Sequence, residues 1–165
     1  MSRSVNSDLK ACTRNDHLLD DERVNPAFRQ LAKQVLATVR LRGLPVIVVE
    51  VFRSRGRQRM LYAQGRSDER LRGAGFTEQE IAAYRRAGAT QDKPVVTHLV
   101  NPQKHGRGLA MDCAWLISGK VSWRAPEAWW ESYGAAAKAV GLIWGGDWKM
   151  KDLPHVEMRE AQIDA

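Results

Sequence analysis

The feature that most constrains the fold is a run of four apolar β-branched residues, Val46-Ile47-Val48-Val49, directly after Pro45. An uninterrupted apolar run of this length is typical of a strand that is covered on both faces. The preceding segment, residues 25–43, predicts a helix. Asn25 and Pro26 match a helix start, apolar residues then recur at helical spacing, and Gly43 ends the run. The two segments together predict a sheet with helices packed against it.

Helices and strands follow one another without a regular order along the rest of the chain. A helix is predicted to begin after residues 52–54 and to stop at Gly65, and another to run from about residue 126 to 140. Short strands are predicted at residues 95–97, 109–117 and 155–158. Because no regular βαβ alternation is present, the predicted fold class is α+β.

The length of 165 residues fits a single domain with a real apolar core. Residues 1–24 are polar and irregular, so we expect an arm or cap there, with residues 25–165 forming the domain. The stretch 66–93 is polar and contains one clear helix, which begins at a capping box of Thr77 and Glu80. We interpret this stretch as a lid-like insertion.

Basic residues outnumber acidic ones, since 26 Lys and Arg against 19 Asp and Glu give a formal net charge of +7. Such a charge favours polyanionic partners, either the bacterial envelope or nucleic acid. We find no nucleic-acid-binding motif of the usual kinds, so nucleic acid is not expected. No apolar run is long enough to span a membrane, and the first residues lack the pattern of a signal peptide. Cys12 and Cys113 fit neither a disulfide framework nor a CxxC zinc site, and Cys113 is expected to be buried.

Two of the four histidines lie in patterns that indicate a metal site. His105 opens the pattern H-x-x-G-x-A-x-D, which ends at Asp112, and His155 ends the pattern D-x-x-H, which begins at Asp152. A catalytic zinc ion takes three ligands such as these and keeps one open position. We therefore predict that His105, Asp112 and His155 bind one zinc ion. Asp152 suits the general base, and Arg53 is the best candidate for stabilising the developing oxyanion.

Other polar and aromatic residues leave two interpretations open. His17 and His98 have no ligand pattern and are expected to be ordinary surface or core residues. Glu157 and Asp147 either orient the histidines or are surface charges, and we leave both outside the predicted site. The six tryptophans are expected to build the core rather than a sugar-binding platform.

The sequence resembles the bacterial and phage zinc peptidases of the D-Ala-D-Ala carboxypeptidase and L-Ala-D-Glu endopeptidase family, relatives of the vancomycin-resistance dipeptidases. The family pattern S-x-H-x-x-G-x-A-x-D is similar to residues 103–112, and D/E-x-x-H is similar to residues 152–155. The pattern R-S-x-x-x-Q-x-x-L-Y-A-Q-G-R is similar to residues 53–66. The motifs keep the family's order between about residues 25 and 158. One departure is Gln103, which stands where the family has serine.

The resemblance implies a small antiparallel sheet with flanking helices, as in hedgehog-like and DD-peptidase-like folds. It implies zinc bound by His105, Asp112 and His155, Asp152 as general base, and Arg53 as a clamp for the substrate or transition state. The implied activity is hydrolysis of peptidoglycan stem peptides by a phage or prophage endolysin with L-alanyl-D-glutamate endopeptidase activity. A D-Ala-D-Ala carboxypeptidase of wall remodelling and a non-catalytic zinc-binding module are the alternatives.

We expect a monomer whose partners are peptidoglycan and the anionic envelope. Because no signal peptide is evident, we expect it in the host cytoplasm until its release to the wall, with secretion by a non-classical route as the alternative.

Overall fold

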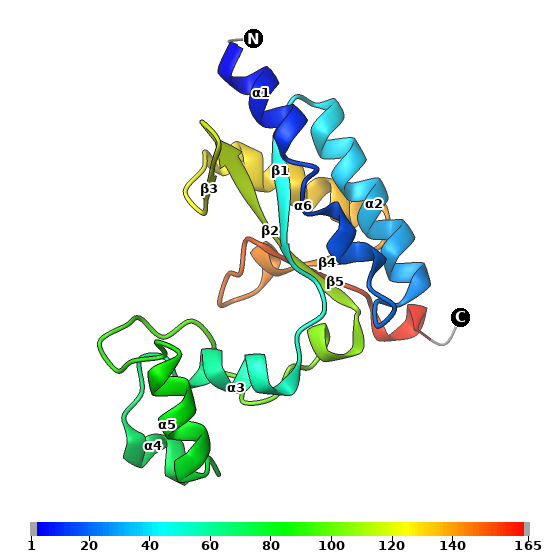
Figure 1. Ribbon diagram of the computed structural model, residues 1–165. Helices are drawn as coiled ribbons and strands as arrows, with labels where there is room; N and C mark the ends of the chain where they lie inside the picture. Colours follow the sequence, from blue (N-terminus) through cyan, green and yellow to red (C-terminus); the bar gives the residue numbers. More distant parts are fainter. Residues whose placement is uncertain (1–2, 164–165) are drawn as a thin grey trace. The chain divides into compact units, whose positions relative to one another are not determined.

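The computed structural model describes residues 3–163, and the chain divides into two compact units. Residues 1–52 and 107–165 form the sheet unit, and residues 53–106 form the helical unit. Figure 1 labels the elements of both. Among residues 3–163, no helix is both long enough and apolar enough to cross a bilayer.

The sheet unit is built around its longest strand, β2 (Ala110–Ile117). β2 pairs with β1 (Val46–Glu50) on one side and β5 (His155–Glu157) on the other, and β4 (Ile143–Trp144) extends the sheet beyond β5. β3 (Lys120–Ser122) forms a hairpin with β2. Every pairing is antiparallel, which confirms the predicted α+β class with a small antiparallel sheet. β3 and β4 were not predicted, because two or three residues are too few to show a period.

Two helices, α2 (Pro26–Leu41) and α6 (Glu127–Ala139), contribute with the strands to the largest apolar core. As predicted, Asn25 caps α2, since its side chain accepts hydrogen bonds from the next backbone amides. From β2 this core takes Met111, Cys113 and Trp115. Successive strand residues point to opposite faces, so Asp112 points to the face away from α2 and α6.

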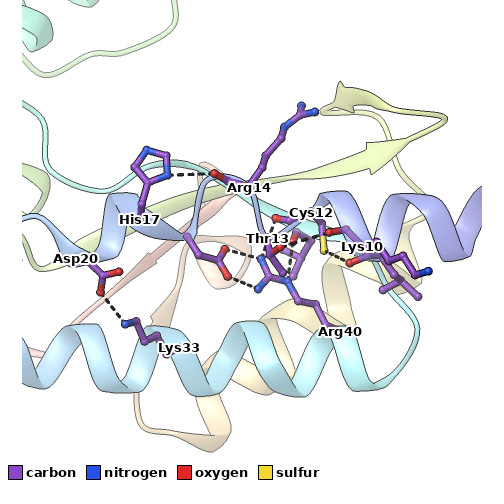
Figure 2. Close-up of polar contacts among 11 residues, drawn as sticks. Lys10, Cys12, Thr13, Arg14, His17, Asp20, Lys33 and Arg40 are labelled. Carbon is purple, nitrogen blue, oxygen red and sulfur yellow. Dashed lines mark hydrogen bonds and ion pairs between the residues drawn. The ribbon is translucent and has the colours of Figure 1, made fainter.

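Residues 3–24 are more ordered than predicted. They form α1 (Arg3–Ala11) and a 3-10 helix, η1 (Asp16–Asp20). Arg40 of α2 holds them in place (Figure 2): its guanidinium donates to both carboxylate oxygens of Asp16, at 2.7 and 2.8 Å, and to the carbonyl of Cys12 at 3.1 Å. Two helices replace the irregular structure that was expected of an arm or cap, because polar bonds from a distant helix order this segment.

The turn between β2 and β3 is also tied to the N-terminal segment. The carboxylate of Asp8 in α1 accepts hydrogen bonds from the backbone amides of Ser118 and Gly119, both at 2.8 Å. Asp8 is buried, and these two bonds satisfy both of its oxygens. α1 therefore stabilises the hairpin of β2 and β3.

The helical unit contains α3 (Arg55–Ala63), α4 (Asp68–Gly73) and α5 (Glu78–Arg86). The capping box of Thr77 and Glu80 is present, but the stretch 66–93 holds two helices instead of the one predicted. The unit has a small apolar core of Ala63, Leu71, Phe76, Ile81 and Ala89. Arginine side chains supplement it. The guanidinium carbon of the buried Arg59, for example, lies 3.8 Å from the ring centre of Phe76, and the guanidinium pairs with Glu80.

The strand predicted at residues 95–97 is absent, and the chain there is irregular. Its backbone carbonyls bond to side chains instead of a neighbouring strand: Gln64 donates to Pro94 and Arg66 donates to Thr97. Val95 and Val96 are exposed, at 44% and 53%. The strand prediction failed because β propensity needs a partner strand to become structure.

The buried cysteine and most of the tryptophans behave as predicted. Cys113 is fully buried, and burial raises the pKa of its thiol to about 12. The rings of Trp129, Trp130 and Tyr133 pack around the buried Trp115, and Trp144 is buried as well. Two tryptophans depart from the prediction, since Trp123 and Trp148 are 52% and 37% exposed.

Candidate metal centre

Asp112 and His155 are brought together by the pairing of β2 and β5. They are direct cross-strand partners in the antiparallel ladder, so their side chains point to the same face of the sheet. His155 Nδ1 lies 3.0 Å from Asp112 Oδ1. Both side chains are largely buried, at 9% and 17% exposure. Strand register therefore places two of the three predicted ligands, although they are far apart in sequence.

His105 opens the short 3-10 helix η2 (His105–Arg107), which leads into β2, and it is buried. The glycine three residues later is required by packing. Gly108 has a φ of +64°, and a Cβ there would overlap with the backbone of Arg23 and Val24. The spacing H-x-x-G thus lets the chain pass this point and enter the strand that carries Asp112.

The three predicted ligands form one donor cluster. His105, Asp112 and His155 each offer one ligand atom, and these atoms all lie within 4.8 Å of one another. Two imidazoles and one carboxylate are the donor types that zinc prefers, and three is the number that a catalytic site uses. The residues present therefore fit the metal that the sequence pattern predicts.

His155 lies in a strongly acidic environment. Burial alone lowers the pKa of its imidazole, but hydrogen bonds to Asp112 and Glu157 outweigh burial and raise the pKa to about 9. The charge of Asp152 acts in the same direction. An imidazole in this position attracts a positive charge, either a proton or a metal ion.

Asp152, the predicted general base, lies on the loop that leads into β5, and its side chain is exposed. Its backbone amide donates to the carbonyl of Gly145 at 2.9 Å, and its carbonyl accepts from the amide of His155 at 3.1 Å. A Cβ at Gly145 would overlap with the carbonyl oxygen of Asp152, so this contact depends on glycine. The loop thus holds an accessible carboxylate at a fixed position three residues before a ligand.

Two buried aromatic residues donate hydrogen bonds to backbone carbonyls of the same loop. Trp144 Nε1 donates to the carbonyl of Leu153 at 2.9 Å, and the hydroxyl of Tyr133 donates to the carbonyl of Pro154 at 3.1 Å. The amide of Cys113 in β2 also donates to Pro154, at 3.0 Å. None of these residues was predicted to hold this loop, because the contacts join segments that are far apart in the chain.

Arg53 lies in the helical unit, directly before Ser54, which caps α3. Its Nη1 donates to Oε1 of Gln58 at 2.9 Å. Gln58 is 1% exposed, and its Nε2 donates to the carbonyl of Leu99 and to the hydroxyl of Thr97. The motif R-S-x-x-x-Q thus contains a side-chain pair, and the role predicted for Arg53 stays a prediction.

The structure also separates residues whose role the sequence left open. Asp147 pairs with Lys138 at 3.0 Å and both are about half exposed, so it is a surface charge. Glu157 lies 3.0 Å from Nε2 of His155. His17 and His98 are exposed, as expected. Period-two alternation in β5 was the available signal for Glu157, since it places residues 155 and 157 on one face.

The sequence profile of the family described as D-alanyl-D-alanine carboxypeptidase matches residues 103–158, which include all three predicted ligands. The chain is 31% identical over 144 residues to the peptidoglycan L-alanyl-D-glutamate endopeptidase CwlK of Bacillus subtilis, covering 82% of this chain and 73% of CwlK. It also resembles the crystal structure of the Serratia marcescens L-Ala D-Glu endopeptidase ChiX. That match has a TM-score of 0.56 and 24% identity, and it covers 93% of this chain and 92% of ChiX.

Proposed function

We propose that this chain is a zinc-dependent L-alanyl-D-glutamate endopeptidase of peptidoglycan. The chain belongs to the D-alanyl-D-alanine carboxypeptidase family of metallopeptidases. The observation that carries the proposal is the donor cluster of His105, Asp112 and His155. CwlK and ChiX are named for this endopeptidase activity, and the relation to CwlK extends over most of both chains.

Different residues would carry out the separate steps of peptide hydrolysis. His105, Asp112 and His155 would hold a zinc ion, which acts as a Lewis acid toward a peptide carbonyl and toward water. Asp152 would take a proton from the attacking water and return it to the leaving amine, because its carboxylate is exposed beside a ligand. Arg53 would offset the negative charge that develops on the carbonyl oxygen.

Digestion of defined muropeptides tests the proposal. With the zinc-loaded protein we expect fragments that carry a new N-terminal D-glutamate, identified by mass spectrometry. A chelator should abolish their release, and added zinc should restore it. Release of D-alanine alone would support the carboxypeptidase instead. Tightly bound zinc without any hydrolysis would support a non-catalytic zinc-binding module.

We further propose that the enzyme is a phage or prophage endolysin that reaches the wall from the host cytoplasm. Expression in a bacterial host, with and without a separate pore-forming holin, tests this role. We expect rapid lysis only when both proteins are produced. Lysis by the enzyme alone would support release by another route.

A further inference from the structure

We propose that Glu157 is a positioning residue that holds the imidazole of His155 with its Nδ1 toward the metal position and its Nε2 protonated. The inference rests on the proposed metal site and adds to it the atom of His155 that binds the ion. It also gives a role to an acidic residue outside the three ligands.

The two nitrogens of the imidazole face different carboxylates. Nδ1 lies 3.0 Å from Oδ1 of Asp112, and Nε2 lies 3.0 Å from Oε2 of Glu157. Asp112 is a member of the donor cluster with His105, and Glu157 is not. The nitrogen that faces the cluster is therefore Nδ1.

The chemistry of imidazole then decides the role of Glu157. A neutral imidazole that binds a metal through one nitrogen carries its proton on the other. That proton lies on Nε2, and the carboxylate of Glu157 is within reach to accept its hydrogen bond. A carboxylate in this place fixes the tautomer, orients the ring and makes the nitrogen ligand more basic.

The backbone of Glu157 lies within the sheet. Glu157 is the Cα partner of Ala110 in β2 and of Ile143 in β4, so a strand lies on each side of it. Its side chain is 16% exposed. The ring of Trp148 packs against His155 with 5.1 Å between ring centres and restricts rotation of the imidazole from another side.

Zinc affinity measured by competition with a chromophoric chelator, on the full chain, tests the proposal. Loss of an orienting carboxylate typically weakens metal binding by about 10- to 100-fold, and we expect this loss for Glu157→Ala. Glu157→Gln should lose less than about tenfold, because its amide oxygen still accepts the Nε2 proton. Glu131→Gln, which removes an exposed carboxylate of α6, is the matched control and should bind zinc like the unchanged protein.

A second measurement separates positioning from folding. In the zinc-loaded protein with 15N-labelled histidine, the NMR signals of His155 should show a protonated Nε2 and a metal-bound Nδ1. Metal on Nε2, or unchanged zinc affinity in Glu157→Ala, would overturn the inference while leaving the proposed peptidase intact. Failure of the unchanged protein to bind zinc would overturn both.

Discussion

Asp152 differs from the three predicted ligands in its exposure and in its place on a loop. Because a general base acts on the reacting atoms without holding the metal, Asp152→Ala should remove activity and keep zinc. We expect the turnover of muropeptides to fall by about 10²- to 10⁴-fold, the usual contribution of a positioned acid or base. Zinc affinity should stay within about threefold of the unchanged protein.

The matched control for that prediction is Asp147→Ala. Asp147 lies five residues earlier and pairs with Lys138 at the surface, so its loss should leave turnover unchanged. If both variants lost activity equally, disturbance of the segment that precedes β5 would explain the result, and the role of Asp152 as a base would be wrong.

The helix α6 contains Gly134 at a position where helix propensity alone favours alanine. Alanine is favoured over glycine inside a helix by about 1 kcal/mol. A Cβ at Gly134, however, would overlap with the indole of Trp144, and overpacking in a core costs about 1–3 kcal/mol. We therefore expect Gly134→Ala to lower the free energy of unfolding, as measured by chemical denaturation.

Gly73, the last residue of α4, is the control for this substitution, because a Cβ there meets no atom within 4 Å. Gly73→Ala should leave stability unchanged or raise it slightly. Because Trp144 also donates to the carbonyl of Leu153, two residues before the predicted ligand His155, Gly134→Ala should weaken zinc binding as well, whereas Gly73→Ala should not.

In α5, the ion pair between Glu80 and Arg59 makes stability depend on pH. Hydrogen bonds from Arg59, and then from the amide of Thr77, lower the pKa of Glu80 to about 2 from its ordinary value of 4.5. Because the pKa of Glu80 is lowered, the stabilisation from its ion pair with Arg59 is complete above about pH 4.5 and is lost as the pH falls toward 2. Far-UV circular dichroism during denaturation should show this loss.

The variant Glu80→Gln tests the cause of that loss. It should be less stable at pH 7 by roughly 1–3 kcal/mol, because Arg59 is buried and loses its charged partner. It should also show a shallower fall of stability below pH 4.5. An identical acid profile in both proteins would contradict the role of this pair.

At the scale of the whole molecule, charge is unevenly divided between the two units. Residues 53–106 contain 11 Lys and Arg and 5 Asp and Glu, which gives +6 of the total +7. If the anionic envelope is a partner, the helical unit carries most of the attraction. Replacing Arg55, Arg70 and Arg86 by Gln should weaken sedimentation with purified anionic walls at low salt. We expect a loss on the order of tenfold or more, because a close charge pair in water contributes about 1 kcal/mol.

The control removes the same charge from the sheet unit, by replacing Lys10, Arg14 and Arg124 with Gln. These residues are also exposed, and their loss should weaken binding less. Salt should abolish the difference between the two triple variants, because it screens exposed charges. Equal losses in both would show that net charge alone governs the attraction.

Features that depend on neighbouring residues could be predicted without the fold. The start of α2 at Asn25 and Pro26, the cap of α5 at Thr77 and the buried strand β1 follow from local bonding and periodicity, and all are present. The three predicted ligands followed from the sequence in the same way, because His105 and His155 each lie in a short pattern that constrains its own backbone.

Contacts between residues far apart in the chain could not be predicted and became clear only from the fold. The register of β2 and β5 places Asp112 opposite His155. β5 also carries Glu157, which lies beside the other ring nitrogen of His155. The apolar residues 95 and 96 found no partner strand and stayed irregular, whereas Arg40 ordered the polar N-terminal segment. The physical reason is that local propensity is weak, so contacts between segments far apart in the chain settle the outcome.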